Sequence, residues 1–178
     1  MTNAIKYQDT KVDVEKTLSD LTNLIKRYGG TRFEQNWTPD GHVRGVRFAI
    51  HHDTLGELPV RMLARTDRIQ KILLDAGLWK SYPRQEREKK VRAQAERIAW
   101  RHVRDLTEQL LLAVQLDIRS MPEAFLADVE IFDSQLGETV RMSDYLQSRA
   151  YTSSEGLVLS SSQHSPIELP AADTGQRA

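Results

Sequence analysis

The sequence predicts an α+β fold of two layers, in which a three-stranded antiparallel sheet is covered by helices and one helix is long and amphipathic. Three segments between residues 31 and 65 alternate apolar and polar side chains, as strands with one buried face do. Short turns separate these segments, which favours antiparallel pairing. From about residue 85 to residue 118, apolar positions recur at helical spacing over many turns.

The first element is a helix over residues 13–28. Its apolar side chains recur every three or four positions and therefore lie on one helix face. They are Val14, Leu18, Leu21, Leu24, Ile25 and Tyr28. Asp13 is the predicted N-cap, because its carboxylate can accept from the first free backbone amides. Gly29 and Gly30 give the helix its C-terminal stop.

The sheet is predicted over about residues 31–65, as a β-hairpin plus a third strand. Its alternating apolar-side positions are Phe33, Gln35, Trp37, Val46, Phe48, Ile50, Leu58, Val60 and Met62. Between the first two strands stands Thr-Pro-Asp-Gly, in which Pro39 presets φ and Gly41 accepts a positive φ. This combination predicts the turn of the hairpin.

Two helices follow the sheet. A short helix begins at Thr66 as its cap and ends at Gly77, with its inward side chains at Ile69, Ile72, Leu73 and Ala76. The long helix covers about residues 85–118. Beyond it, the sequence predicts a short helix at 122–127, a strand near 129–132 and a last helical turn near 144–149.

The C-terminal stretch from residue 151 to residue 178 is rich in Ser, Pro and Ala and has no periodicity. Such a composition is typical of a disordered tail. The remaining residues, 1–150, are predicted to form a single domain.

Charge is balanced over the whole chain, with 25 Lys and Arg against 25 Asp and Glu. It is nevertheless unevenly placed, because cations dominate from Arg84 to Arg104 and acids dominate after Met121. A basic middle and an acidic end indicate either a site for a polyanion or self-association between unlike parts.

Several classes of function are disfavoured by composition. The chain has no cysteine, so thiolate zinc sites and cysteine nucleophiles are excluded. No helical His-x-x-x-His pair and no nucleophile elbow occur, so we expect no metal, no cofactor and no enzymatic activity. No apolar run is long enough to span a membrane, and we expect the protein in the cytoplasm of a bacterial host.

The long helix allows two interpretations. Its apolar stripe comprises Val91, Ala95, Ile98, Ala99, His102, Val103, Leu106, Leu110, Ala113 and Val114. A polar ridge on nearly the opposite side comprises Lys90, Gln94, Arg97, Arg101, Arg104 and Glu108. Either the ridge is only the solvated back of a core helix, or its cations follow the phosphates of a nucleic acid. Trp100, at the flank of the ridge, would stack on an exposed base or pack beneath a loop.

The sheet provides a second basic group. Arg44 and Arg47 lie on the returning hairpin strand, and Arg61 and Arg65 lie on the third strand, with Arg68 on the helix after it. Arg47, Arg61 and Arg65 alternate with apolar residues, so they are expected to share the sheet face away from the helices. With Trp37 nearby, this face has the composition of a platform for single-stranded nucleic acid.

Three short motifs carry a resemblance that covers most of residues 12–145. They are Glu-Arg-x-Ala-Trp-Arg at 96–101, Pro-Glu-x-Phe-Leu at 122–126 and Gly-Glu-Thr-Val at 137–140. With these motifs the chain resembles a family of small, mostly uncharacterised proteins carried by phages and other mobile elements. The order β-β-β-α is also similar to the core of phage single-strand annealing proteins, which implies a role in recombination.

The leading hypothesis is therefore a non-enzymatic, mobile-element protein that binds nucleic acid, preferentially single-stranded DNA. Arg47, Arg61 and Arg65 would hold phosphates together with Arg44, and Trp37 and Trp100 would stack on bases. Lys90, Arg97, Arg101 and Arg104 would extend the phosphate track. The first alternative is an inhibitor or adaptor whose basic ridge docks on an acidic protein surface. The second is a homo-oligomer in which the acidic C-terminal part of one copy meets the ridge of the next.

Overall fold

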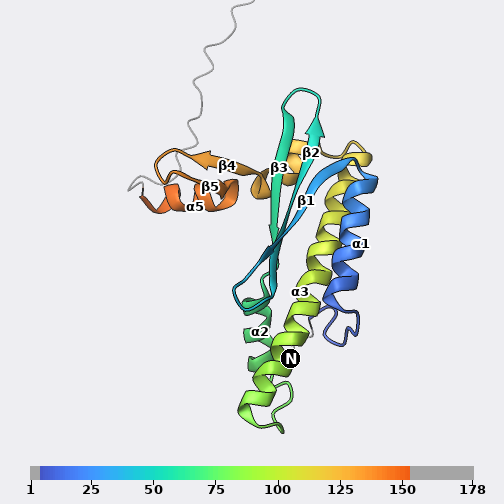
Figure 1. The fold of residues 1–178 in the computed structure, drawn as a ribbon, viewed down its shortest axis with the longest axis vertical. Helices are drawn as coiled ribbons and strands as arrows, with labels where there is room; N and C mark the ends of the chain where they lie inside the picture. The colour runs from blue at the N-terminus through green and yellow to red at the C-terminus, as the bar shows by residue number, and fades with distance from the viewer. Residues whose placement is uncertain (1–4, 153–178) are drawn as a thin grey trace, which may run out of the picture.

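The computed structural model describes residues 5–152 and confirms the α+β class, with a three-stranded antiparallel sheet and one long helix (Figure 1). In chain order the elements are α1 (Val14–Arg27), β1 (Gly30–Trp37), β2 (Val43–His52), β3 (Gly56–Leu63), α2 (Thr66–Asp75), α3 (Arg84–Gln115), α4 (Met121–Phe125), the 3-10 helix η1 (Leu126–Asp128), β4 (Glu130–Asp133), β5 (Glu138–Arg141) and α5 (Met142–Thr152). The predicted tail beyond residue 152 lies outside the described residues.

The main sheet has the order β1-β2-β3, with both pairs antiparallel. The predicted turn closes the β1–β2 hairpin, because the amide of Thr38 donates to the carbonyl of His42 at 2.8 Å. Gly41 has φ +77°, a conformation that glycine adopts without steric cost. On β3, Val60 stands opposite Phe48 of β2, so the apolar positions of the two strands face the same side.

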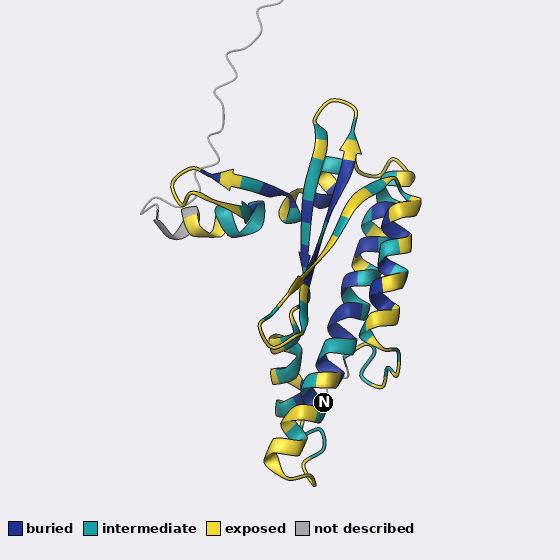
Figure 2. Cartoon of the chain, in the orientation of Figure 1, coloured by how far each residue is buried: buried dark blue, intermediate teal, exposed yellow. Residues whose placement is uncertain are grey.

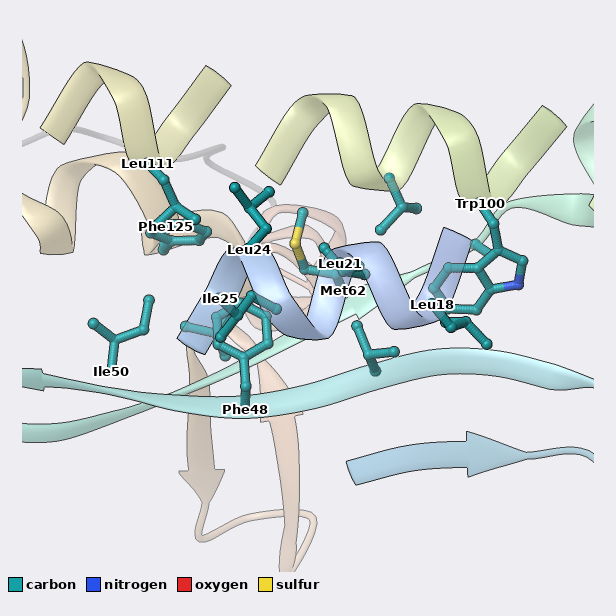
Figure 3. Packing of buried hydrophobic residues seen from close by; sticks show 14 of the residues in the cluster. Leu18, Leu21, Leu24, Ile25, Phe48, Ile50, Met62, Trp100, Leu111 and Phe125 are labelled. Carbon is teal, nitrogen blue, oxygen red and sulfur yellow. The ribbon is translucent and has the colours of Figure 1, made fainter. Parts of the chain in front are cut away.

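The helices α1 and α3 run side by side over one face of this sheet (Figure 1). The inner face carries Val46, Phe48 and Ile50, all fully buried as the alternation predicts. Phe48 meets Phe125 of α4 edge to face, with ring centroids 6.1 Å apart. Figure 3 shows the side chains of the sheet and of both helices meeting in this core.

A second apolar cluster joins α2 to the N-terminal part of α3. Its buried members are Leu73, Val91, Ala95 and Ile98. Arg87 of α3 completes the end of α2, because its guanidinium donates to the carbonyl oxygens of Leu74 and Leu78 at 3.0 and 2.8 Å. A cation at the C-terminal end of a helix satisfies free carbonyl groups and opposes the helix dipole.

The C-terminal elements β4, β5 and α5 form an arm that extends sideways from the main sheet (Figure 1). A β-bridge between Val60 and Val129, and a bond from the Met142 amide to the Val129 carbonyl, attach it to the body. Figure 2 shows much of its surface as exposed. Phe132 and Leu136 are among its exposed side chains. The strand β4 and the last helix were predicted, whereas β5 was not.

Several details of the predicted elements are wrong. The N-cap of α2 is Arg65 rather than Thr66, and Ala76, which was expected to point inward, is exposed. Leu106 of the apolar stripe is 48% exposed, and Ile72 of the short helix is 39% exposed. Asp13 stands at the N-cap of α1, but its side chain makes no capping hydrogen bond. Its carboxylate lies instead 3.4 Å from Arg97 of α3, where a guanidinium offers a stronger partner than a free amide.

Among residues 5–152, none of the helices has the length and apolar content that crossing a membrane would need.

Candidate functional site

Three of the four cations of the predicted ridge on α3, Lys90, Arg97 and Arg104, are already paired with acids of the chain. Arg104 lies 2.6 Å from Glu108 and 3.1 Å from Asp105. Lys90 lies 3.4 Å from Glu86, and its ammonium group sits 3.5 Å from the centre of the Tyr82 ring. Together with the pair between Arg97 and Asp13, these contacts remove most of the excess positive charge from this face.

The ridge is also covered by the segment before α1. Gln94, predicted to be solvated, is 6% exposed, and its amide donates to the carbonyl oxygens of Gln8 and Thr10 at 2.7 and 3.0 Å. Tyr7 stacks over this face, with its ring centre 5.3 Å from the Arg101 guanidinium. The periodicity of α3 could not predict this cover, because it comes from a polar segment that is distant in sequence.

Asp105 is the centre of the contacts that hold this segment. Burial raises the pKa of the Asp105 carboxyl, but hydrogen bonds from the Tyr7 hydroxyl, the Lys6 ammonium and the Arg104 guanidinium outweigh it and lower that pKa to about 2. The carboxylate is therefore charged and fully engaged at neutral pH.

The predicted position of Trp100 at the flank of the ridge is wrong. Its side chain is completely buried and lies in the same cluster as Leu18 of α1 (Figure 3). The reason is that α3 packs on two sides, against α1 and the sheet on one and against α2 on another. Trp100 is thus a core residue and cannot stack on a base in this fold.

The outer face of the sheet is not the open arginine surface that was expected. Arg47 and Arg61 stand opposite each other in register, so these two share one face of the sheet, as predicted. Glu130 of the arm lies between them, with one carboxylate oxygen on Arg47 and the other 3.3 Å from Arg61. Its side chain is only 3% exposed, so both guanidiniums pair with a buried charge.

Arg44 and Arg65 have a different environment from the other predicted arginines. Arg65 lies beyond the end of β3, directly before α2, and so does not share the face of Arg47 and Arg61. Both side chains are exposed, and so is that of Arg68 in the first turn of α2. Within the described part of the chain, no ion pair or hydrogen bond engages these three guanidiniums. The charge of Arg65 acts to lower the pKa of the arm carboxyls Asp128 and Asp144, but from beyond ion-pair distance.

These three arginines line one cleft of about 570 Å³. Its walls are the β1–β2 turn, the end of β3, the start of α2 and one side of α3, which lie together in the lower half of Figure 1. Charged side chains around it are Arg44, Arg65, Arg68, Arg92, Asp67 and Glu96. The cleft therefore has a surplus of two positive charges when His42, which also lines it, is neutral.

The wall formed by α3 is held by a chain of polar contacts. Nδ1 of His42 lies 2.9 Å from Glu96, and Arg92 lies 3.6 Å from the same carboxylate and 3.9 Å from Asp40 of the turn. These contacts fix the β1–β2 turn against α3. They also occupy Arg92, so the free cations of the cleft are the other three arginines.

Trp37 lies next to this cleft. It is 62% exposed at the end of β1 and lines a second hollow of about 340 Å³. The two hollows share His42, Val43 and Glu96, so they meet at the start of β2. An exposed indole and a group of free guanidiniums therefore occupy neighbouring parts of one surface.

The sequence had placed these residues in one basic group together with Arg47 and Arg61, but it could not show that those two pair with an acid while the others stay free. Arg44 and Arg65 come together because β2 and β3 pair in antiparallel register, with Gly45 opposite Leu63.

Within the described residues, no group of three or more His, Asp or Glu side chains is placed to hold a metal ion. Comparison of the chain with known proteins found no family model, no curated protein and no solved structure that matches it.

Proposed function

We propose that this protein binds single-stranded nucleic acid through the cleft between the β1–β2 turn and the start of α2. Arg44, Arg65 and Arg68 hold phosphates, and Trp37 stacks on a neighbouring base. The observation that carries the proposal is that three exposed arginines line one cleft without a carboxylate partner. The mobile-element origin suggested by the sequence motifs stays a prediction.

The electrostatic reason is the contrast with the rest of the surface. Elsewhere most of the arginines singled out in the sequence meet acids of their own chain, as Arg47 does with Glu130 and Arg104 with Glu108. In the cleft three guanidiniums have no carboxylate of the described residues within ion-pair distance, and the lining carries two positive charges in excess. A phosphate chain would neutralise this excess and release counterions, which favours binding at low salt.

A single strand fits the exposed indole better than a duplex does. Stacking on an aromatic side chain requires a base whose face is free, and it contributes about 1–3 kcal/mol per base. In a duplex these faces are covered by neighbouring bases. Trp37, 62% exposed beside the cleft, is therefore the feature that favours an unpaired strand.

The test measures fluorescence anisotropy of a labelled single-stranded oligonucleotide at several salt concentrations. The variant carries Arg44→Glu and Arg65→Glu. The control carries Arg27→Glu and Arg119→Glu, which make the same change of net charge at exposed arginines outside the cleft. We expect the cleft variant to lose at least about tenfold in affinity and the control to lose little.

Two results would contradict the proposal. One is the absence of binding by the unchanged protein at low salt. The other is an equal loss of affinity in the cleft variant and in the control, which would indicate a nonspecific effect of net charge. A competing duplex of the same sequence should displace the strand poorly.

A second candidate is association between copies of this chain through the arm. Phe132 and Leu136 of the arm are 68% and 61% exposed, and β4 and β5 form a sheet of only two strands. A two-stranded sheet is marginally stable and leaves strand edges open for pairing with another chain. Light scattering of the free protein tests it: a dimer that Phe132→Ser dissociates supports association, and a monomer excludes it.

A further inference from the structure

We infer that the cleft binds the phosphorylated end of a nucleic-acid strand, that is, a terminal phosphate monoester rather than an internal diester. The inference rests on the proposed function and specifies the ligand of the same site. Three features of the site support it: the three free arginines lie together, they leave the cleft with an excess of positive charge, and the cleft has walls on several sides.

The three guanidiniums come from one corner of the fold rather than from a line. The amide of Ala64 donates to the carbonyl oxygen of Arg44 at 3.0 Å. Arg65 is the next residue after Ala64, so its backbone lies close to that of Arg44. Arg68 lies three residues further, one helical turn along α2. A protein surface that binds the internal phosphates of a strand needs cations spaced along that strand. A compact cluster of cations is suited to one anionic group.

The charge of the cleft agrees with a dianion. Four arginines line it against Asp67 and Glu96, which leaves two positive charges in excess. An internal phosphodiester carries one negative charge, whereas a phosphate monoester carries about −1.5 to −2 at pH 7 and has three acceptor oxygens. Guanidinium groups match such oxygens with two parallel hydrogen bonds each.

The cleft is bounded in a way that suits a strand end. The β1–β2 turn, β3, α2 and α3 all contribute to its walls, and its volume of about 570 Å³ is within the usual range for a discrete ligand. On the side of His42 it meets the hollow that Trp37 lines. A terminal nucleotide can place its phosphate among the arginines while the strand leaves past the indole.

The experiment compares three oligonucleotides of one sequence with an internal fluorescent label. One carries a 5′-phosphate, one a 3′-phosphate and one hydroxyl groups at both ends. We expect one phosphorylated form to bind at least about tenfold more tightly than the hydroxyl form, and the form that does so identifies the end that is bound. Arg68→Gln should weaken binding of the phosphorylated form more than binding of the hydroxyl form, and so remove this advantage.

Arg68 is exposed and unpaired, so its substitution is not expected to disturb folding, which circular dichroism verifies. Arg68→Lys serves as the conservative variant and should retain part of the advantage. Equal binding of all three oligonucleotides overturns the inference but leaves the proposed function intact. An advantage that persists in Arg68→Gln also overturns it. If none of the oligonucleotides binds, the proposed function fails as well.

Discussion

Arg61 of β3 lies 3.3 Å from the carboxylate of Glu130 in β4, and the second oxygen of that carboxylate contacts Arg47 of β2. One buried acid thus joins two strands of the main sheet to the arm. The two guanidiniums would repel each other across the strands without it, since they stand directly opposite in register. Glu130 therefore fixes the position of the arm as well as neutralising this face.

Replacement of Glu130 by Gln should destabilise the protein. The side chain keeps its shape but loses its charge, and two guanidiniums are left against a neutral, buried amide. Because both arginines are partly solvated, we expect a loss of about 1–3 kcal/mol in the free energy of unfolding. Urea unfolding measures it, with Glu138→Gln on the exposed side of the arm as the control. Equal stability of the two variants would show that the ion pairs contribute nothing.

Gln94→Ala should release the segment before α1. The substitution removes both hydrogen bonds from the Gln94 amide to the carbonyl oxygens of Gln8 and Thr10. We expect a loss of about 1–3 kcal/mol and faster hydrogen exchange of the backbone amides of this segment. Gln109→Ala, at an exposed position of the same helix, is the matched control. Unchanged exchange in the Gln94 variant would contradict the role assigned to this side chain.

Arg87→Met should weaken the end of α2. The methionine keeps most of the apolar stem, but the carbonyl oxygens of Leu74 and Leu78 lose their charged donor. Hydrogen bonds that involve a charged group contribute about 1.5–3 kcal/mol each, so we expect a loss of about 2 kcal/mol after partial replacement by water. Thermal unfolding of this variant is compared with that of Lys89→Met, which alters an exposed cation nearby. A melting temperature equal to that of the control would refute the capping role.

The contribution of Asp105 to stability should disappear in acid. Its pKa is about 2 in the folded protein and near 3.8 in the unfolded chain, so the unfolded chain takes up the proton first as the pH falls. The stabilisation is complete above about pH 4 and is lost as the pH falls toward 2; at 1.36 kcal/mol per unit it amounts to about 2 kcal/mol.

Urea unfolding between pH 2 and pH 6 measures this effect as the difference between the unchanged protein and Asp105→Asn. The exposed Asp75→Asn is the control for the removal of one carboxyl group from the surface. A constant difference for Asp105→Asn over the same range would mean that Tyr7, Lys6 and Arg104 do not stabilise the charged carboxylate.

Local sequence patterns predicted most of the helices and strands, because these elements depend mainly on residues that are close in sequence. The 3.6-residue period gave α1 and α3, and the turn residues Pro39 and Gly41 gave the hairpin. The strand β5 was missed because Glu138–Arg141 has only one apolar side chain, Val140, and shows no alternation. It forms through pairing with β4, with Val140 opposite Ile131.

The candidate site was only partly predictable, because ion pairs depend on contacts between distant parts of the chain. The sequence indicated which residues are cationic, including Arg44 and Arg65. It could not indicate that Glu130 would reach Arg47, or that Asp13 would reach Arg97. Which arginines remain free is a property of the tertiary structure.

Two of the three tryptophans, the buried Trp100 and the exposed Trp37, are optical probes in opposite surroundings. An indole enclosed by hydrocarbon emits at shorter wavelength than one in water, and its emission changes when the core comes apart. The indole at the rim of the cleft is open to contact quenching by a stacked base. Titration with an unlabelled strand should therefore dim the long-wavelength part of the spectrum and leave the short-wavelength part unaltered.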